Sequence, residues 1–490
     1  MILLYNPQSS SVRKPCLPLS LLALSAVLED EHDHHIIDGN LEHDPLQCLD
    51  ALISKTRAQV LGFTVMPGPQ LQEAVPLARE LKRRHPQVTI VWGGYFPSQH
   101  WDVCLRSGYV DYVVRGHGEI VFTNLLRALK GDGRVEDIQG LAYCGEDGTP
   151  RTNPLAPIPQ PAELPEWNWD RVAMEQYVCK SYLGDRTLAY HSSYGCPFFC
   201  NFCAVVNMVQ GGWLPQPAER VANVVKLYVE RWRINGLALY DNNFFVSQKR
   251  IAEFAARILG LGVNWWGEAR IDTLLNFQPR TWKLMRDSGL RMVFMGAESG
   301  SAETLQRMDK GGTMHPDKTL EMARVMKEWK IIPEFSFVMG NPPDPVADIR
   351  DTMEFIRKVK RVNQEAEIIM YLYTPVPLSG QLFEAAKADG FAFPETLEEW
   401  ISESWLKFSR RRSDTMPWLQ QSLRSQLRDF ERVLNAYYPT ATDIKLTRTW
   451  RKALRALSAW RYHTRMYRFP FELEVMHRLI AYQRPETTGF

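Results

Sequence analysis

Short continuous apolar runs alternate with longer amphipathic segments through the first 145 residues of the chain. The runs are rich in β-branched and aromatic residues and predict strands buried on both faces, whereas apolar residues three and four positions apart predict helices. The expected strands are residues 2–6, 35–39, 60–66, 88–92 and 112–115, and the expected helices are residues 17–29, 46–57 and 71–84. This order predicts an α/β domain with a doubly wound parallel sheet, which binds ligands at the carboxyl ends of its strands.

A second alternation of strands and helices begins near residue 186. Before it, a short hairpin is expected at residues 141–153, and residues 146–185 contain five prolines between positions 154 and 165, which is typical of a linker. The expected strands of the second alternation are residues 188–193, 237–240, 264–269, 292–297, 335–339 and 368–373. Six strand–helix units are too few for a closed eight-stranded barrel, so the pattern predicts a partial (β/α)6 barrel of the TIM type.

The end of the chain differs from the rest in charge and in aromatic content. Residues 400–490 hold 17 Lys and Arg against 8 Asp and Glu, although the whole chain is balanced at 58 against 56. Trp, Tyr and Arg interleave there at helical spacing, so we expect a basic, mainly helical C-terminal domain that caps the barrel and helps to select the substrate. The expected division is a ligand-binding sheet domain at 1–145, a linker at 146–185, the barrel at 186–395 and the helical domain at 396–490.

Composition excludes several classes of protein. A net charge of +2 excludes a chain that is strongly acidic or strongly basic throughout, and eight cysteines in 490 residues are too sparse for a disulfide scaffold. The first residues have no basic region followed by an apolar core, and the apolar stretch at residues 17–28 is too short to cross a bilayer. We therefore expect a cytoplasmic protein.

Three of the cysteines lie within eight residues, in the segment GCPFFCNFC, where they are Cys196, Cys200 and Cys203. Three thiolates on one loop can bind three irons of a 4Fe–4S cluster and leave the fourth iron open to another ligand. A structural zinc ion is the alternative, but it needs a fourth ligand at short range. The nearest candidate, His191, falls inside an expected strand.

This CxxxCxxC loop, with the aromatic Phe202 before its last cysteine, resembles the radical S-adenosylmethionine (SAM) superfamily, which places the loop after the first barrel strand. The resemblance implies a 4Fe–4S cluster on the three cysteines and SAM chelated to the open iron. It also implies SAM contacts at the carboxyl ends of later strands, although acids and glycines are common at strand ends for other reasons. Together with Phe202, the candidate SAM-binding residues are Asp241, Glu268, Arg270, Glu298 and Gly340.

The N-terminal sheet domain resembles that of the cobalamin-dependent branch of the superfamily, and the joint resemblance spans residues 1 to about 395. It is carried by LGFTVMPGPQ (61–70), VWGGYFPS (91–98) and VDYVVRGHGE (110–119). The resemblance implies cobalamin at Pro69, Gly93, Gly94, Gly116 and Glu119. No DxHxxG motif follows the first strand, which implies cobalamin bound without a histidine ligand below the cobalt. A flavodoxin-like domain that has lost its ligand is the alternative.

Both resemblances together imply a methyltransferase that methylates an unactivated carbon, or phosphorus, through a 5′-deoxyadenosyl radical and methylcobalamin. Cyclisation, ring rearrangement or redox chemistry with the same cofactors is the first alternative, and a cobalamin-binding sensor or carrier without catalysis is the second. No catalytic side chain is identified. The expected partners are a small-molecule or natural-product-type substrate and a low-potential electron donor such as flavodoxin or ferredoxin. No nucleic acid is expected, and contact with a membrane surface stays open.

Overall fold

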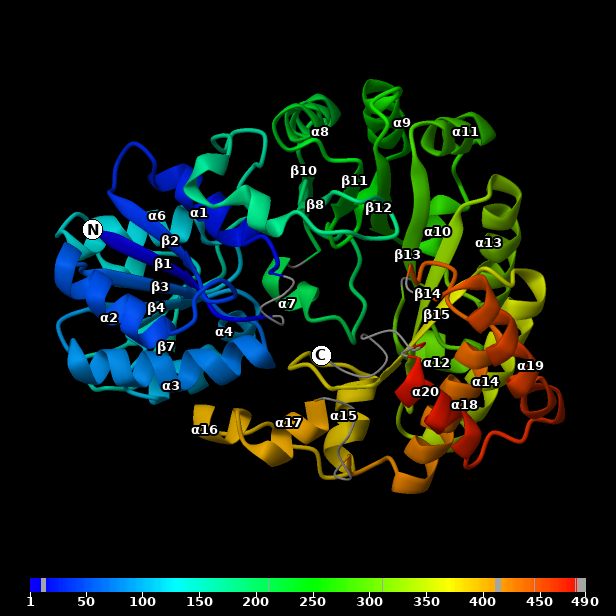
Figure 1. Ribbon diagram of the computed structural model, residues 1–490. Coiled ribbons are helices and arrows are strands. Elements are labelled where there is room, and N and C mark those ends of the chain that lie inside the picture. The colour runs from blue at the N-terminus through cyan, green and yellow to red at the C-terminus, as the bar shows by residue number, and fades with distance from the viewer. Residues whose placement is uncertain are drawn as a thin grey trace.

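The computed structural model describes residues 1–9, 15–209, 211–310, 312–409, 416–444, 446–480 and 482. The N-terminal sheet domain and the barrel lie side by side, and the last helices lie on the outer side of the barrel (Figure 1).

The N-terminal domain is a seven-stranded sheet with the order β2-β1-β3-β4-β5-β6-β7. The first five strands are parallel, and the last two form an antiparallel hairpin at one edge. The strands are β1 (Ile2–Asn6), β2 (His34–Asp38), β3 (Val60–Thr64), β4 (Thr89–Gly93), β5 (Tyr112–Val114), β6 (Leu141–Cys144) and β7 (Pro150–Thr152). The predicted parallel sheet is confirmed, and the predicted hairpin extends it past residue 145.

Helices cover both faces of this sheet, as the continuous apolar strands predict. One face packs against α1 (Leu19–Leu28) and α6 (Gly118–Leu129), and the other against α2 (Pro45–Thr56), α3 (Pro69–Arg84) and α5 (Trp101–Arg106). The short helix α4 (Tyr95–Gln99) follows β4 directly. Because these strands are parallel, their carboxyl ends lie together at one edge of the sheet.

The predicted linker is packed rather than free. It contains the short helices η2 (Trp169–Arg171) and η3 (Met174–Tyr177), and their side chains Trp169 and Tyr177 are buried in the barrel's core cluster. The Tyr177 hydroxyl donates to Asp38 of the sheet domain at 2.8 Å, and Arg171 pairs with Glu29 at 2.8 Å. The linker thus joins the two domains through buried and ionic contacts.

The second domain is a six-stranded sheet with the order β15-β14-β13-β12-β11-β8, and all its neighbouring strands are parallel. Its strands are β8 (Thr187–Tyr190), β11 (Gly236–Leu239), β12 (Asn264–Ala269), β13 (Leu290–Glu298), β14 (Ile332–Met339) and β15 (Glu367–Leu372). Because β8 and β15 are the two ends of this strand order and do not pair with each other, the predicted open six-unit barrel is confirmed.

Helices follow the barrel strands in turn. They are α8 (Ala218–Trp232), α9 (Gln248–Ile258), α10 (Ile271–Leu274), α11 (Pro279–Asp287), α12 (Ala302–Arg307), α13 (Pro316–Trp329) and α14 (Pro345–Val362). A short antiparallel pair, β9 (Ser193–Gly195) with β10 (Trp213–Pro215), encloses α7 (Val205–Val209). The first barrel strand ends earlier than expected, so His191 lies between β8 and β9 and not inside a strand.

The C-terminal segment is helical, as predicted. It follows α15 (Gln381–Ala388) and comprises α16 (Leu397–Trp400), α17 (Glu403–Ser409), α18 (Gln421–Tyr437), α19 (Arg448–Thr464) and α20 (Phe471–Leu479). However, α16 does not sit on the barrel alone, because Leu397 and Trp400 belong to the same buried cluster as Trp92 and Phe96 of the sheet domain. In the part of the chain that the structure describes, no helix is both long and apolar enough to cross a bilayer.

Candidate functional site

The cysteine loop is fixed at both of its ends. Gly195 closes β9 with φ of +78°, and a Cβ atom there would lie 2.1 Å from the carbonyl oxygen of Gly212, so only glycine fits. Further along, Asn201 donates its backbone N–H to Met308 at 3.2 Å and its side-chain amide to Arg307 at 2.7 Å. The loop is therefore held between the β9–β10 pair and the segment after α12.

The three cysteines of the loop are free thiols. Burial raises the pKa of all three, that of Cys203 to about 12, and the positive charges of Arg270 and Lys310 counter this at Cys196 and Cys200. A buried thiolate becomes favourable when a metal cation lies beside it, which iron would supply. No three such ligand groups converge on one metal position among the described residues, but the thiolates of a 4Fe–4S cube bind separate irons. The loop thus fits the cluster that the sequence predicts.

Arg270 stands at the carboxyl end of β12 and touches the cysteine loop. Its Nη1 donates to the Sγ of Cys200 at 3.3 Å, and its guanidinium lies 3.8 Å from the ring centroid of Phe198. Two further hydrogen bonds, of 3.0 and 2.8 Å, hold it to both carboxylate oxygens of Asp272. Such a bidentate pair fixes the guanidinium in place next to the thiol.

Glu298 ends β13 at an irregularity of the sheet, with φ of +62°, a conformation unusual for a non-glycine residue. Its Oε1 lies 2.5 Å from the Nζ of Lys310, which also donates to the carbonyl of Gly296. Both side chains are almost fully buried. A buried pair at a strained backbone position is typical of a functional site, so Lys310 joins Glu298 as a candidate.

Asp241 follows β11 and forms hydrogen bonds within the protein. Its carboxylate accepts hydrogen bonds from the backbone N–H and hydroxyl of Ser192 and from the hydroxyl of Ser193. It is fully buried, so it stabilises the turn between β8 and β9. Asn243, two residues later, lies beside the cysteine loop. Burial raises the pKa of the Cys196 thiol, and a hydrogen bond from the Asn243 amide partly lowers it again. Asn243 is itself almost fully buried, so its amide is held next to the Cys196 thiol.

Glu268 lies near the carboxyl end of β12 with its carboxyl shielded from water. Burial, reinforced by the negative charges of Asp241 and Glu334, raises its pKa to about 8. At neutral pH this side chain therefore holds a proton. A neutral carboxyl in the barrel can donate a hydrogen bond where a carboxylate could not.

Gly340 follows β14 with φ of +76° and is held on both sides. Its N–H donates to Asp348 at 2.8 Å, and its carbonyl accepts a hydrogen bond of 3.0 Å from the Trp418 indole. Asp348 also accepts from Asn341 and from the Ser299 hydroxyl, so it joins the segments that follow β13 and β14. The sequence gives a weak signal for Asp348, since an acid in the first turn of a helix is common.

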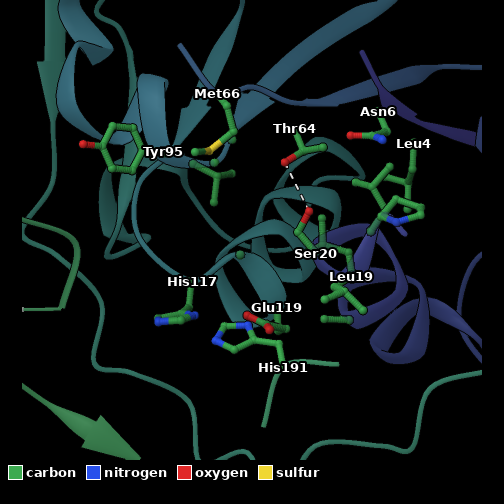
Figure 2. Close-up of a pocket in the computed structure, with 18 of the residues that line it drawn as sticks. Leu4, Asn6, Leu19, Ser20, Thr64, Met66, Tyr95, His117, Glu119 and His191 are labelled. Carbon is green, nitrogen blue, oxygen red and sulfur yellow. Dashed lines mark hydrogen bonds between the residues drawn. The ribbon is translucent and has the colours of Figure 1, made fainter. Parts of the chain in front are cut away.

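The sheet domain contains a cavity of about 670 Å³ at the carboxyl ends of β1, β3, β4 and β5. Its floor reaches between α1 and the sheet, where Ser20 and Thr64 share a hydrogen bond of 3.2 Å (Figure 2). Its opposite wall comes from the barrel side and includes His191, Tyr194 and Tyr240. A cavity of this size between two domains suits a large cofactor.

The predicted cobalamin residues lie mostly on this cavity. Gly93, Gly94, Gly116 and Glu119 line it, whereas Pro69 lines a neighbouring cavity. A Cβ on Gly94, whose φ is +97°, would lie 3.0 Å from the backbone nitrogen of Val65, so a side chain would displace the loop after β3. The glycines thus keep the strand ends open to a ligand.

Glu119 joins the two domains across the cavity wall. The Tyr194 hydroxyl donates to Glu119 at 2.5 Å, and burial raises the pKa of this carboxyl. The ring of His117 stacks on Tyr194 with centroids 4.2 Å apart, and burial lowers the pKa of His117 to about 3. Figure 2 shows His117, Glu119 and His191 grouped on one side of the cavity. The sequence offers His191 only as a ligand of the alternative zinc site and gives no separate role to His117.

A second cavity, of about 650 Å³, adjoins the first, because Met66, Gln70 and Tyr95 line both. Phe202 of the cysteine loop and the segment after β15 also line it. The edge of the parallel sheet and the cysteine loop therefore face neighbouring spaces between the two domains.

Comparisons with known families agree with this geometry. A model of the B12 binding domain matches residues 9–126, and a model of the radical SAM superfamily matches residues 190–366. The chain is a cobalamin-dependent radical SAM protein. Both predicted resemblances are thereby confirmed, and with them cobalamin, SAM and the 4Fe–4S cluster as the cofactors of this radical SAM protein.

Two relatives match the chain over about three quarters of their own length. It is 28% identical over 367 residues to an uncharacterized methyltransferase of Pyrococcus horikoshii, covering 73% of this chain and 78% of that protein. It is 25% identical over 393 residues to an anaerobic magnesium-protoporphyrin IX monomethyl ester cyclase of Synechocystis, covering 76% and 74%. Among solved structures, the cobalamin-dependent SAM radical enzyme OxsB with aqua-cobalamin bound shares the fold, with a TM-score of 0.68, 15% identity, and coverage of 98% and 75%.

Proposed function

We propose that this radical SAM protein transfers a methyl group to an unactivated carbon, or to phosphorus, of a small molecule. The observation that carries the proposal is the junction of the two cavities at Met66, Gln70 and Tyr95, with Phe202 of the cysteine loop on the second cavity. A substrate in the second cavity would lie between the cysteine loop and the cobalamin cavity. The similarity to a methyltransferase of Pyrococcus horikoshii supports the same reaction.

The protein's part in the reaction is to bind, orient and exclude water. When bound, SAM with its cluster supplies a hydrogen-abstracting radical, and cobalamin supplies the methyl group. Cys196, Cys200 and Cys203 hold the cluster, and Arg270 and Lys310 place positive charge beside them. Glu268 holds a proton at neutral pH and can donate it as a hydrogen bond.

The other candidate residues fall into one group near the cysteine loop and another near the cobalamin cavity. For SAM we propose contacts with Phe202, Glu268, Arg270, Asn243, Gly340 and the Glu298–Lys310 pair, with Asp241 acting through the β8–β9 turn. For cobalamin we propose contacts with Gly93, Gly94 and Gly116, while Glu119 positions Tyr194. Pro69 belongs to the wall between the cavities. The sheet domain is best bounded after Thr152, because β7 belongs to its sheet.

Cyclisation with the same cofactors is the second candidate, favoured by the similarity to the cyclase of Synechocystis. The two reactions differ in their products, since methyl transfer also yields S-adenosylhomocysteine and cyclisation does not need to. A sensor or carrier without catalysis is disfavoured, because it would have no use for three thiols on one loop, one of which contacts Arg270. We further propose a cytoplasmic location and a low-potential electron donor such as flavodoxin or ferredoxin, without nucleic acid. Contact with a membrane surface is not part of the proposal.

The test is anaerobic reconstitution of the full chain with iron, sulfide and hydroxocobalamin, followed by a strong reductant and SAM. We expect four irons, one corrinoid and formation of 5′-deoxyadenosine. Cys200→Ala should abolish 5′-deoxyadenosine formation, whereas Cys144→Ala, at an exposed free cysteine of β6, should leave it unchanged. Equal behaviour of the two variants would contradict the radical assignment, and failure to retain corrinoid would contradict methyl transfer from cobalamin.

A further inference from the structure

The second cavity has walls that are rich in aromatic rings. Rings from three separate parts of the chain line it, among them Phe96, Phe202, Tyr371, Phe393, Trp400 and Trp405. None of the described residues that line it is Lys, Arg, Asp or Glu. Its volume of about 650 Å³ lies within the range of roughly 300–1,000 Å³ common for small-molecule sites.

Four of these rings, Phe96, Phe393, Trp400 and Trp405, form a continuous wall. Phe393 and Trp400 stack with centroids 5.8 Å apart and an interplanar angle of 19°, and Trp405 contacts Trp400 edge-on at 4.7 Å. Phe96 of α4 packs edge-on against the same Trp400 at 5.0 Å. Because these contacts join the sheet domain to the C-terminal segment, the wall is a fixed part of the fold and does not depend on one exposed side chain.

The titratable histidine of this cavity carries no charge at neutral pH. His100 lies 4.4 Å from the ring of Trp400 and 5.0 Å from that of Phe393, centroid to centroid. Burial lowers its pKa to about 4, slightly opposed by the charge of Asp102. The remaining polar side chains that line the cavity, such as Gln70, Gln99 and Thr374, are neutral. The described lining can therefore form hydrogen bonds, but it offers no ionic side chain to neutralise a charged ligand.

Three arginines of the C-terminal helices are engaged within that segment. Arg461 pairs with Glu472, Arg432 pairs with Glu474, and Arg451 donates to the carbonyls of Thr440 and Asp443. The residues that this segment contributes to the cavity are Trp400 and Trp405. The C-terminal segment therefore contributes aromatic surface to the cavity.

We infer that the second cavity binds the substrate, and that the substrate is an uncharged, largely apolar molecule with a flat ring system. The identification of the ligand as a substrate rests on the proposed function. The preference for a neutral ligand follows from the residues that line the cavity. A buried carboxylate or phosphate would lose its hydration without gaining a counter-ion, whereas a flat apolar molecule would stack on the aromatic wall.

The test compares two probes of the same shape, methyl naphthoate and the naphthoate anion, by equilibrium dialysis against the cobalamin- and cluster-loaded protein at pH 7.5. We expect the ester to bind in a ratio of one per chain and at least about tenfold more tightly than the anion, because the anion must be buried unpaired. The matched variants are Thr374→Lys and Thr374→Gln, at an exposed position that lines the cavity. The lysine should reduce the preference for the ester about tenfold by pairing with the anion, and the glutamine should preserve it.

Val346→Lys places the same charge on an exposed site of α14 and should leave the preference unchanged. Equal or tighter binding of the anion by the unaltered protein would overturn the inference, as would a preference that Thr374→Lys does not change. Loss of ester binding when cobalamin is loaded would assign the cavity to cobalamin and would also overturn it. If the proposed function is wrong, no 5′-deoxyadenosine will form, whatever the ligand preference is. This outcome is therefore distinct from failure of the ligand preference.

Discussion

The Nη1 of Arg270 lies 3.3 Å from the Sγ of Cys200, so a cation touches the middle thiol of the cysteine loop. The guanidinium cannot easily move away, because Asp272 accepts two of its hydrogen bonds and Lys310 accepts a third through its backbone carbonyl. A fixed positive charge next to a cluster ligand favours the reduced, more negative state of the cluster.

Replacement of Arg270 should therefore lower the reduction potential of the reconstituted cluster. A charge-assisted hydrogen bond contributes roughly 1.5–3 kcal/mol, which for one electron corresponds to a decrease of roughly 60–130 mV in Arg270→Gln. Arg270→Lys should retain most of the potential because it retains the charge. Potentiometric titration followed by electron paramagnetic resonance measures the shift, with Arg257→Gln, on the outer helix α9, as the control. A potential that is the same in Arg270→Gln and the control would contradict this role.

Glu268 should make the stability of the cofactor-free protein depend on pH. Its pKa is raised from 4.5 to about 8 by burial and by the charges of Asp241 and Glu334. The folded state therefore binds more protons than the unfolded chain between these pH values, so the free energy of unfolding falls as the pH rises through that range. Glu268→Gln removes this loss because its amide does not ionise.

Thermal unfolding at pH 5 and pH 8.5 tests this expectation. The Tm of Glu268→Gln should be close to that of the unaltered protein at pH 5 and higher at pH 8.5, by roughly 2–4 °C for each kcal/mol recovered. Glu230→Gln, on the exposed face of α8, serves as the control and should show no such difference. A Tm difference that is equal at both pH values would mean that Glu268 is not protonated in the folded state.

Local sequence patterns predicted the two sheets and the cysteine loop, because each of these features depends on residues that are close together in the sequence. The thiols at Cys196, Cys200 and Cys203 are close in sequence, and a glycine such as Gly94 is required by its own backbone conformation. Continuous apolar runs likewise predict buried parallel strands wherever they occur.

The roles that depend on distant partners could not be predicted in this way. The sequence places Asp241 at a strand end as a candidate SAM-binding residue, but it does not show that the turn after β8 brings Ser192 and Ser193 to its carboxylate. Trp400 reads as the start of a basic domain, yet it packs against Phe96 of the sheet domain. In each case the deciding contact joins segments that no local pattern relates.

Asp348 should be required for the loops that follow β13 and β14. Its Oδ2 accepts from the backbone N–H groups of Gly340 and Asn341 at 2.8 and 3.1 Å, and its Oδ1 accepts from the Ser299 hydroxyl at 3.1 Å. Asp348→Ala leaves these buried donors unpaired, which costs roughly 1–3 kcal/mol for each group and is not additive.

Asp348→Asn separates the hydrogen bonds from the charge. Its amide oxygen can take the place of Oδ2, and its amide nitrogen can donate to the Ser299 hydroxyl, so the Tm should fall much less than in Asp348→Ala. Asp351→Ala, an exposed position on the same helix, is the control for helix α14. Equal decreases in Tm for the alanine and asparagine variants would show that charge, and not hydrogen bonding, is what the loops need.

Cobalamin should bind without a histidine nitrogen on its cobalt. His117 and His191 line the cavity, but the Nε2 atom of each is buried against protein, and the His117 ring is stacked on Tyr194. A nitrogen that coordinates cobalt must point its lone pair into the cavity. Neither Nε2 atom is accessible for this in the structure.

Electron paramagnetic resonance of the bound cobalt(II) form measures the axial ligand directly. We expect a spectrum without the three-line splitting that an axial nitrogen imposes on each cobalt line, and we expect His117→Ala and His191→Ala to give the same line shape as the unaltered protein. Tyr194→Phe is the matched variant for the cavity wall, since it removes the hydroxyl bonded to Glu119 but keeps the ring under His117. Nitrogen splitting that disappears in one histidine variant would identify that residue as the cobalt ligand and would show that its ring turns when cobalamin binds.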